Sequence, residues 1–167
     1  RIVDASDNPK MKLLYLSSIG DMYHQLGDAR KAFKVYDKCL KMDPSYSPVL
    51  NNYAYYLSLQ GKKLKKAYTM SRKTIEAEPD NATYLDTYGW ILFLQKKYPE
   101  AKGIFKHAML YGGKESSTIL DHYAEVLFAL KDYDLASFYW EQALNKAEGQ
   151  EKVDLKQKIE LRKSQKK

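Results

Sequence analysis

The sequence is poor in cysteine, glycine and proline. Its single cysteine, Cys39, excludes an internal disulfide. Only 8 glycines and 5 prolines interrupt 167 residues, which favours long helices with short turns over a sheet of many strands. No stretch approaches the ~20 consecutive apolar residues of a membrane-spanning helix, and no signal-peptide pattern is present. The chain opens with RIVDASDNP and no initiator Met, so we interpret it as a piece of a longer protein.

The sequence also lacks the motifs of catalysis. It contains no HExxH, GxxxxGK[ST], GxSxG or GxGxxG. The three histidines fall on different predicted helices. His122 and Glu125 are three residues apart, as in some metal-binding helices, but no second pair faces them and a metal site needs three or four ligands. We therefore predict a protein that is not an enzyme and needs no cofactor or metal.

Positive charge is concentrated at the C-terminal end. The net charge is +7, and residues 151–167 hold seven basic and three acidic residues, so the first 150 residues carry only +3. We interpret this tail as a solvated end; a weak contact with an anionic membrane or partner is left open. The other lysine-rich stretch, KKLKK at 62–66, is not interleaved with aromatic residues that could stack on bases, which argues against nucleic-acid binding.

The apolar positions form a repeat with a step of 34 or 35 residues. Each repeat reads as two amphipathic helices joined by a tight turn. One small residue recurs in the first helix, and Ala recurs in the second, so the two helices can approach closely. We expect Asn8, Ser47, Asp28 and Asp132 to cap helices, and Pro99 to lie in a first helical turn. The small positions are Gly20, Ala54, Gly89 and Ala124, with Ala32, Ala67, Ala101 and Ala136.

Four in-phase copies of this pattern resemble the tetratricopeptide repeat. The matching segments are YLSSIGDMYHQLGDARKAFKVYDKCLKMDP, VLNNYAYYLSLQGKKLKKAYTMSRKTIEAEP, TYLDTYGWILFLQKKYPEAKGIFKHAM and ILDHYAEVLFALKDYDLASFYWEQAL. Leucine replaces the signature tryptophan in every copy, and Lys96 and Lys131 replace the turn glycine in the last two. The resemblance implies an all-α, right-handed α-solenoid of four helix-turn-helix units with a C-terminal capping helix.

The repeat phase also gives an expected organisation of the chain. Residues 1–8 read as the end of a preceding repeat or a linker, so we expect more repeats upstream. Residues 150–167 read as a capping helix that frays into the basic tail. The four repeats lie between them, at about 9–46, 47–80, 81–115 and 116–149.

A narrower resemblance concerns two aromatic segments. NNYAYYL and YLDTYGWILF are similar to segments of tetratricopeptide proteins from bacterial cell envelopes, including lipoproteins. That resemblance implies a bacterial protein of the periplasm or outer membrane; the cytoplasm is the alternative.

In this family the first helix of each pair lines a concave groove that binds proteins or peptides. The resemblance therefore implies a groove with four carboxylates, several aromatic rings and no Lys or Arg. Such a surface suits an extended partner with basic and apolar groups. For Trp90 the alternative is burial beneath the second helix of the neighbouring unit. The implied groove residues are Ser17, Asp21, His24, Asn51, Tyr55, Ser58, Asp86, Trp90, Phe93, Asp121, Glu125 and Phe128.

One family function can be compared residue by residue. Domains that clamp the acidic EEVD tail of heat-shock chaperones use Lys, Asn, Asn, Lys and Arg. The matching positions here hold Ser17, Asp21, Asn52, Thr83 and Thr87, so only the second Asn is kept. We therefore predict no carboxylate clamp. The predicted function is a non-enzymatic protein-interaction module or scaffold; the alternative is a structural spacer or a self-associating solenoid within a larger protein.

Overall fold

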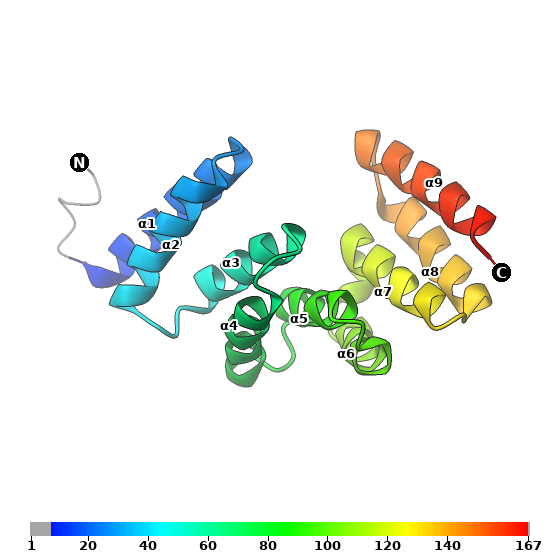
Figure 1. The fold of residues 1–167 in the computed structure, drawn as a ribbon, viewed down its shortest axis with the longest axis horizontal. Coiled ribbons are helices and arrows are strands. Elements are labelled where there is room, and N and C mark those ends of the chain that lie inside the picture. Colours follow the sequence, from blue (N-terminus) through cyan, green and yellow to red (C-terminus); the bar gives the residue numbers. More distant parts are fainter. Residues whose placement is uncertain (1–7, 167) are drawn as a thin grey trace. The chain divides into compact units, whose positions relative to one another are not determined.

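The computed structural model describes residues 8–166, and this part of the chain is helical throughout, with no strands. The chain divides into two compact units between Pro79 and Asp80. The first unit contains two antiparallel helix pairs, coloured blue to green in Figure 1. Its helices are α1 (Pro9–Gln25), α2 (Ala29–Met42), α3 (Ser47–Leu59) and α4 (Leu64–Ala77).

The second unit contains two more helix pairs and a final helix. None of the described helices in either unit is long and apolar enough to span a membrane. The prediction that residues 1–8 end a preceding repeat lies outside the described residues, apart from Asn8. The helices of this unit are α5 (Ala82–Leu94), α6 (Tyr98–Leu110), the 3-10 helix η1 (Gly113–Glu115), α7 (Ser117–Ala129), α8 (Tyr133–Lys146) and α9 (Gly149–Ser164).

The helix starts follow most of the capping signals. The Asn8 side chain accepts a hydrogen bond from the backbone N–H of Lys10 at 3.0 Å, and Asp28 accepts one from Lys31 at 3.0 Å. Pro99 lies in the first turn of α6, as expected. The prediction for Ser47 is wrong, because Ser47 already belongs to the first turn of α3. Asp132 occupies the N-cap position of α8, as predicted, but its side chain makes no cap hydrogen bond.

The two small positions that hold glycine are close-packing points between paired helices. A Cβ atom added to Gly89 would lie 2.7 Å from Cε2 of Phe105, and one added to Gly20 would overlap the ring of Tyr36. Both rings are fully buried. The sequence explains this contact only in part: it predicts small residues on both helices, but the group that fills the space above each glycine is an aromatic ring from the second helix.

The turns between paired helices use the left-handed backbone region. Gly27 has φ 80°, and Lys96 and Lys131 adopt φ 62° and 63°. These two lysines replace the turn glycine of the repeat, and they take its conformation despite their side chains. The last two helix pairs therefore keep the turn geometry at a cost in backbone strain.

The final helix α9 packs beside α8, where the sequence predicts a capping helix. Leu155 and Ile159 are buried, whereas Val153 and Leu161 are exposed. Only a narrow apolar stripe thus contributes to the core of the second unit. The remaining contacts of α9 are polar, and they involve residues that the sequence assigns to a binding surface.

Candidate functional site

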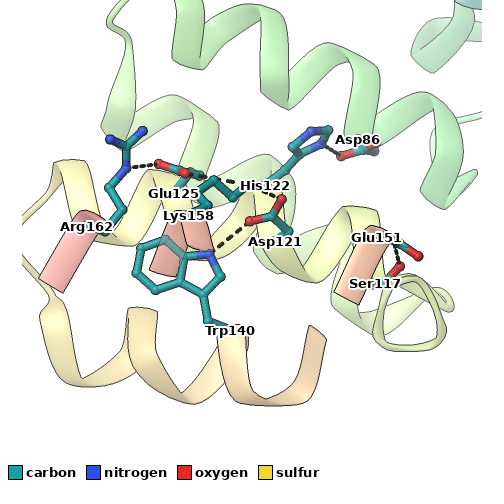
Figure 2. A network of polar contacts seen from close by, with 9 residues as sticks. All are labelled: Asp86, Ser117, Asp121, His122, Glu125, Trp140, Glu151, Lys158 and Arg162. Carbon is teal, nitrogen blue, oxygen red and sulfur yellow. Dashed lines mark hydrogen bonds and ion pairs between the residues drawn. The ribbon is translucent and has the colours of Figure 1, made fainter. Parts of the chain in front are cut away.

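The most distinctive arrangement on the first helices is built around Trp90 of α5. Its indole ring stacks on the His122 imidazole of α7, with centroids 4.1 Å apart, and on Phe93, with centroids 4.7 Å apart. His122 is buried, and its Nδ1 lies 2.7 Å from Oδ1 of the buried Asp86 (Figure 2). We call Asp86, Trp90, Phe93 and His122 the Trp90 cluster.

The Trp90 cluster contains both fixed and accessible side chains. Asp86 and His122 are buried, whereas Trp90 and Phe93 are partly exposed. The carboxylate orients the imidazole, and the imidazole supports one face of the indole. Phe93 also contacts Tyr98 at the start of α6, with ring centroids 5.4 Å apart. The arrangement therefore presents an aromatic surface whose support is already in place before any partner binds.

Two further predicted carboxylates bind side chains of α9. Arg162 donates from Nε to Oε2 of Glu125 at 3.0 Å, and Lys158 forms an ion pair with Asp121 (Figure 2). Lys158 also lies 3.7 Å from Oε1 of Glu125. Trp140 donates from Nε1 to Asp121 at 2.9 Å. Glu125 is 4% exposed, so it does not line an open surface as the sequence predicts.

In the first unit, the Asp21 carboxylate likewise joins α1 to neighbouring helices. It accepts hydrogen bonds from the Tyr36 hydroxyl and from Nδ2 of Asn52, the latter at 3.0 Å. Burial, together with the hydrogen bond to Asp21, raises the pKa of Tyr36 well above its usual range. Asn51 is buried and donates to Asn52 at 3.2 Å. Asn52, the one residue that matches a carboxylate clamp, is thus engaged within the unit.

The remaining predicted residues lie against aromatic neighbours. The His24 imidazole stacks on the Tyr56 ring with centroids 3.4 Å apart, and Tyr55 is half-buried beside the same ring. Phe128 is also half-buried, between the rings of Tyr133 and Trp140. Ser17 and Ser58 are buried.

A common relationship connects these contacts. Each carboxylate on a first helix is bound by a donor from the next first helix, or from α9 after the last pair. Asp21 binds Asn52, Asp86 binds His122, and Asp121 binds Lys158. Sequence reasoning missed these pairs. A signal for the last pair was present, because Lys158 and Arg162 have the same four-residue spacing as Asp121 and Glu125.

Two kinds of reactive group are absent among the described residues, a metal-binding cluster and an accessible thiol. Among residues 8–166, no group of three or more His, Cys, Asp or Glu side chains could hold a metal ion. Cys39 is fully buried, and burial raises the pKa of its thiol to about 11, so it is a poor nucleophile near neutral pH. The polar side chains of the first helices chiefly join neighbouring helices, whereas the rings of Tyr55, Trp90, Phe93 and Phe128 are partly exposed.

Comparison with known proteins identifies repeats of a known family in part of the chain. Residues 15–46 and 35–68 match tetratricopeptide repeat families, and the comparison with curated protein sequences gave no match. A structure of PilF from Pseudomonas aeruginosa is similar, with a TM-score of 0.73 and 26% identity, covering 94% of this chain and 74% of that one. Residues 15–68 thus match tetratricopeptide repeats, in agreement with the resemblance.

Two more distant structures share the fold. TTC0263, a tetratricopeptide protein from Thermus thermophilus, has a TM-score of 0.73 at 18% identity, covering 95% of this chain and 83% of that one. MamA from Desulfovibrio magneticus RS-1 has a TM-score of 0.67 at 19% identity, covering 84% of this chain and 86% of that one. Together with the helices described above, they confirm the all-α fold of tetratricopeptide helix pairs. Proteins of this family generally mediate protein–protein interactions and are generally non-catalytic.

Proposed function

We propose that this chain is a non-enzymatic protein-interaction module that binds a peptide or partner protein through the exposed residues of its first helices. The observation that carries the proposal is the Trp90 cluster. A large ring is held partly exposed by a stacked imidazole, and that imidazole is itself held by a buried carboxylate at 2.7 Å.

The Trp90 cluster suits binding because little conformational freedom is left to lose. Tryptophan buries a large area with only two side-chain torsions, and it is enriched at the energetic centres of interfaces. Here stacking on His122 and Phe93 further restricts the ring. A partner that covers Trp90 and Phe93 therefore gains apolar burial at a small cost in side-chain entropy.

The carboxylates of the first helices indicate which chemical groups a partner could present to them. Glu125 and Asp121 are compensated by Arg162 and Lys158 of α9. Among the described residues, in contrast, Asp21 is bound by the neutral donors Tyr36 and Asn52 alone. On the first helices of the second unit, the proposed contacts are therefore chiefly apolar. In the first unit, taken by itself, attraction for a basic group centres on Asp21.

A peptide-library selection against the immobilised chain tests this proposal. The informative variant is Trp90→Ala, and Phe138→Ala is its matched control. Phe138 is an exposed aromatic on α8, a second helix, so the two variants remove similar side chains from different faces. Circular dichroism establishes that both variants remain folded before the selection.

We expect peptides with apolar anchors to be enriched by the wild type and by Phe138→Ala, and lost with Trp90→Ala. Equal enrichment by all three proteins would contradict the assignment of the binding surface. A lack of enrichment, together with self-association that depends on Trp90, would favour the alternative of a self-associating solenoid.

A further inference from the structure

Positive charge is distributed unevenly between the two units of the chain. With histidine neutral, residues 8–79 hold 13 basic and 6 acidic side chains, a net charge of +7. Residues 80–167 hold 14 basic and 13 acidic side chains, a net charge of +1, even though they include the basic tail. The excess charge of the protein therefore belongs to the first unit, and peptide binding at Trp90 does not use it.

On α2 the basic residues gather on the face opposite the core. Tyr36 and Cys39 are fully buried, whereas the basic residues recur every three to four positions on the other side and so share one helix face. Asp37 interrupts this row, and Asp28 forms an ion pair with Lys31 at 3.0 Å. The exposed basic residues of the row are Arg30, Lys31, Lys34, Lys38 and Lys41.

The turn between α3 and α4 adds a second basic group on the same edge of the first unit. Lys66, at the start of α4, donates from Nζ to the Tyr53 hydroxyl at 3.1 Å. The Tyr53 ring also stacks on Phe33, near the start of α2, with centroids 4.8 Å apart. The starts of α2 and α4 therefore lie on the same edge, and so do the two turns that precede them. The exposed lysines of the second turn are Lys62, Lys63 and Lys65.

Each of these two turns also exposes a leucine. Leu26 follows the last residue of α1 and is 79% exposed, and Leu59 ends α3 and is 54% exposed. Apolar side chains among cations combine the two attractions of a peripheral membrane site, which are burial at the headgroup boundary and charge. We use the term basic edge for Leu26, Arg30, Lys31, Leu59, Lys62, Lys63 and Lys65.

The composition of the basic edge favours an anionic membrane over other anionic partners. Lysine outnumbers arginine four to one, and a lysine ammonium is a hydrated point charge that suits a diffuse layer of anionic headgroups. A single-stranded nucleic acid would need exposed rings for base stacking, but every aromatic side chain in residues 8–79 is buried or half-buried. An acidic protein would satisfy the lysines but gives no reason for a leucine at each turn.

We propose that the basic edge binds the surface of an anionic membrane, with its lysines at the headgroups and with Leu26 and Leu59 at the boundary with the acyl chains. Each basic side chain near such a surface strengthens binding by a factor of about five. This attraction is screened beyond about 8 Å at physiological ionic strength, so binding should weaken as salt is raised. The inference does not depend on peptide binding at Trp90.

The test measures how the full chain sediments with vesicles of phosphatidylcholine that contain about 30% phosphatidylserine, and with vesicles of phosphatidylcholine alone. The charge variant combines Lys62→Gln, Lys63→Gln and Lys65→Gln. Its matched control removes the same charge from exposed sites of the second unit. The control combines Lys106→Gln, Lys114→Gln and Lys156→Gln.

A second pair of variants tests the two leucines. The apolar variant combines Leu26→Gln and Leu59→Gln, and its control is Leu110→Gln, because Leu110 is 74% exposed on α6. Circular dichroism establishes that every variant is folded. Polyglutamate and duplex DNA are titrated into the wild type as the alternative anionic partners.

We expect the wild type to bind the anionic vesicles and not the vesicles of phosphatidylcholine alone. The affinity should fall by about tenfold or more in the charge variant, and by about threefold or more in the apolar variant. Each control should change the affinity by no more than about twofold.

Absence of binding to the anionic vesicles, or equal losses in the charge variant and its control, would overturn the proposal. Binding that the apolar variant leaves unchanged would also overturn it, because charge alone would then suffice. Tighter binding of polyglutamate or duplex DNA than of the vesicles would assign the basic edge to an acidic protein or to nucleic acid instead.

Discussion

Gly89 and Phe105 are in such close contact that the glycine cannot carry a side chain without displacing the ring. A Cβ atom at Gly89 would lie 2.7 Å from Cε2 of Phe105, and the ring is fully buried. Glycine in the middle of a helix costs about 1 kcal/mol relative to alanine. The packing of α5 against α6 offsets this cost.

This contact predicts that Gly89→Ala destabilises the protein, although alanine is the better helix former. We expect a net loss of about 1–2 kcal/mol in the free energy of unfolding, and a larger loss for Gly89→Leu. Gly103 provides the control, because a Cβ atom there meets nothing within 4 Å. Gly103→Ala should instead stabilise by about 0.5–1 kcal/mol. Denaturant unfolding measures both, and equal changes in the two variants would contradict the packing account.

The ion pair between Glu125 and Arg162 predicts that α9 is held to α7 by charge as well as by apolar contact. Arg162→Ala leaves the buried Glu125 with only the longer contact to Lys158 at 3.7 Å. We expect a loss of about 1–3 kcal/mol, reduced because Arg162 is partly exposed. In a protein that already carries Glu125→Gln, the substitution Arg162→Ala should cost less. A double-mutant cycle with no coupling energy would show that the pair contributes nothing.

The left-handed turns predict a gain in stability. Lys131 adopts φ 63° at a position where the first pair has Gly27 at φ 80°. Lys131→Gly relieves the strain of a side chain in this region and should stabilise by about 0.5–1 kcal/mol, after the greater flexibility of glycine in the unfolded chain is included. The control is Lys114→Gly, outside these turns, which should not stabilise. A lower melting temperature for Lys131→Gly would contradict the prediction.

Burial of Tyr123 predicts a loss of stability at alkaline pH. Burial, assisted by Tyr139 and Asp132, raises the pKa of Tyr123 to about 12. Its pKa in the unfolded chain is about 10. Between these values the folded protein binds more protons than the unfolded chain, so the free energy of unfolding decreases as pH rises.

In the Tyr123→Phe variant, the free energy of unfolding should decrease less as pH rises. The difference from the wild type should reach up to about 3 kcal/mol near pH 12, with no comparable difference below pH 9. The control is Tyr111→Phe, since Tyr111 is exposed. Chemical unfolding between pH 8 and 12 gives the comparison. Parallel pH profiles for the wild type and Tyr123→Phe would show that Tyr123 ionises equally in both states.

The repeat phase explains how much of the fold the sequence predicted. Spacing located Gly89 and Ala101 in paired helices, because a 34-residue step fixes which positions face the partner helix. It did not identify Phe105 as the group above Gly89, since several large residues satisfy the same spacing. The spacing also did not fix where each helix begins. Serine is a residue type that commonly caps helices, but α3 begins at Ser47 itself and not after it.

The candidate site was less predictable, because it depends on contacts between helix pairs. The sequence placed Asp121 and Glu125 on one helix face, but it did not show that α9 brings Lys158 and Arg162 to that face. Likewise, the pairing of Asp86 with His122 depends on the register of α5 against α7. The roles of the predicted residues in binding stay a prediction.

The most direct test of the proposed binding surface uses the two tryptophans of the chain, which differ in exposure. Trp90 is partly exposed, whereas Trp140 is 3% exposed and donates from Nε1 to Asp121. A peptide enriched by the wild-type chain is titrated into the ¹⁵N-labelled protein, and the two indole N–H resonances are followed by NMR. We expect the resonance of Trp90 to shift in proportion to binding and that of Trp140 to stay in place. Binding that leaves the Trp90 resonance unchanged would contradict the account.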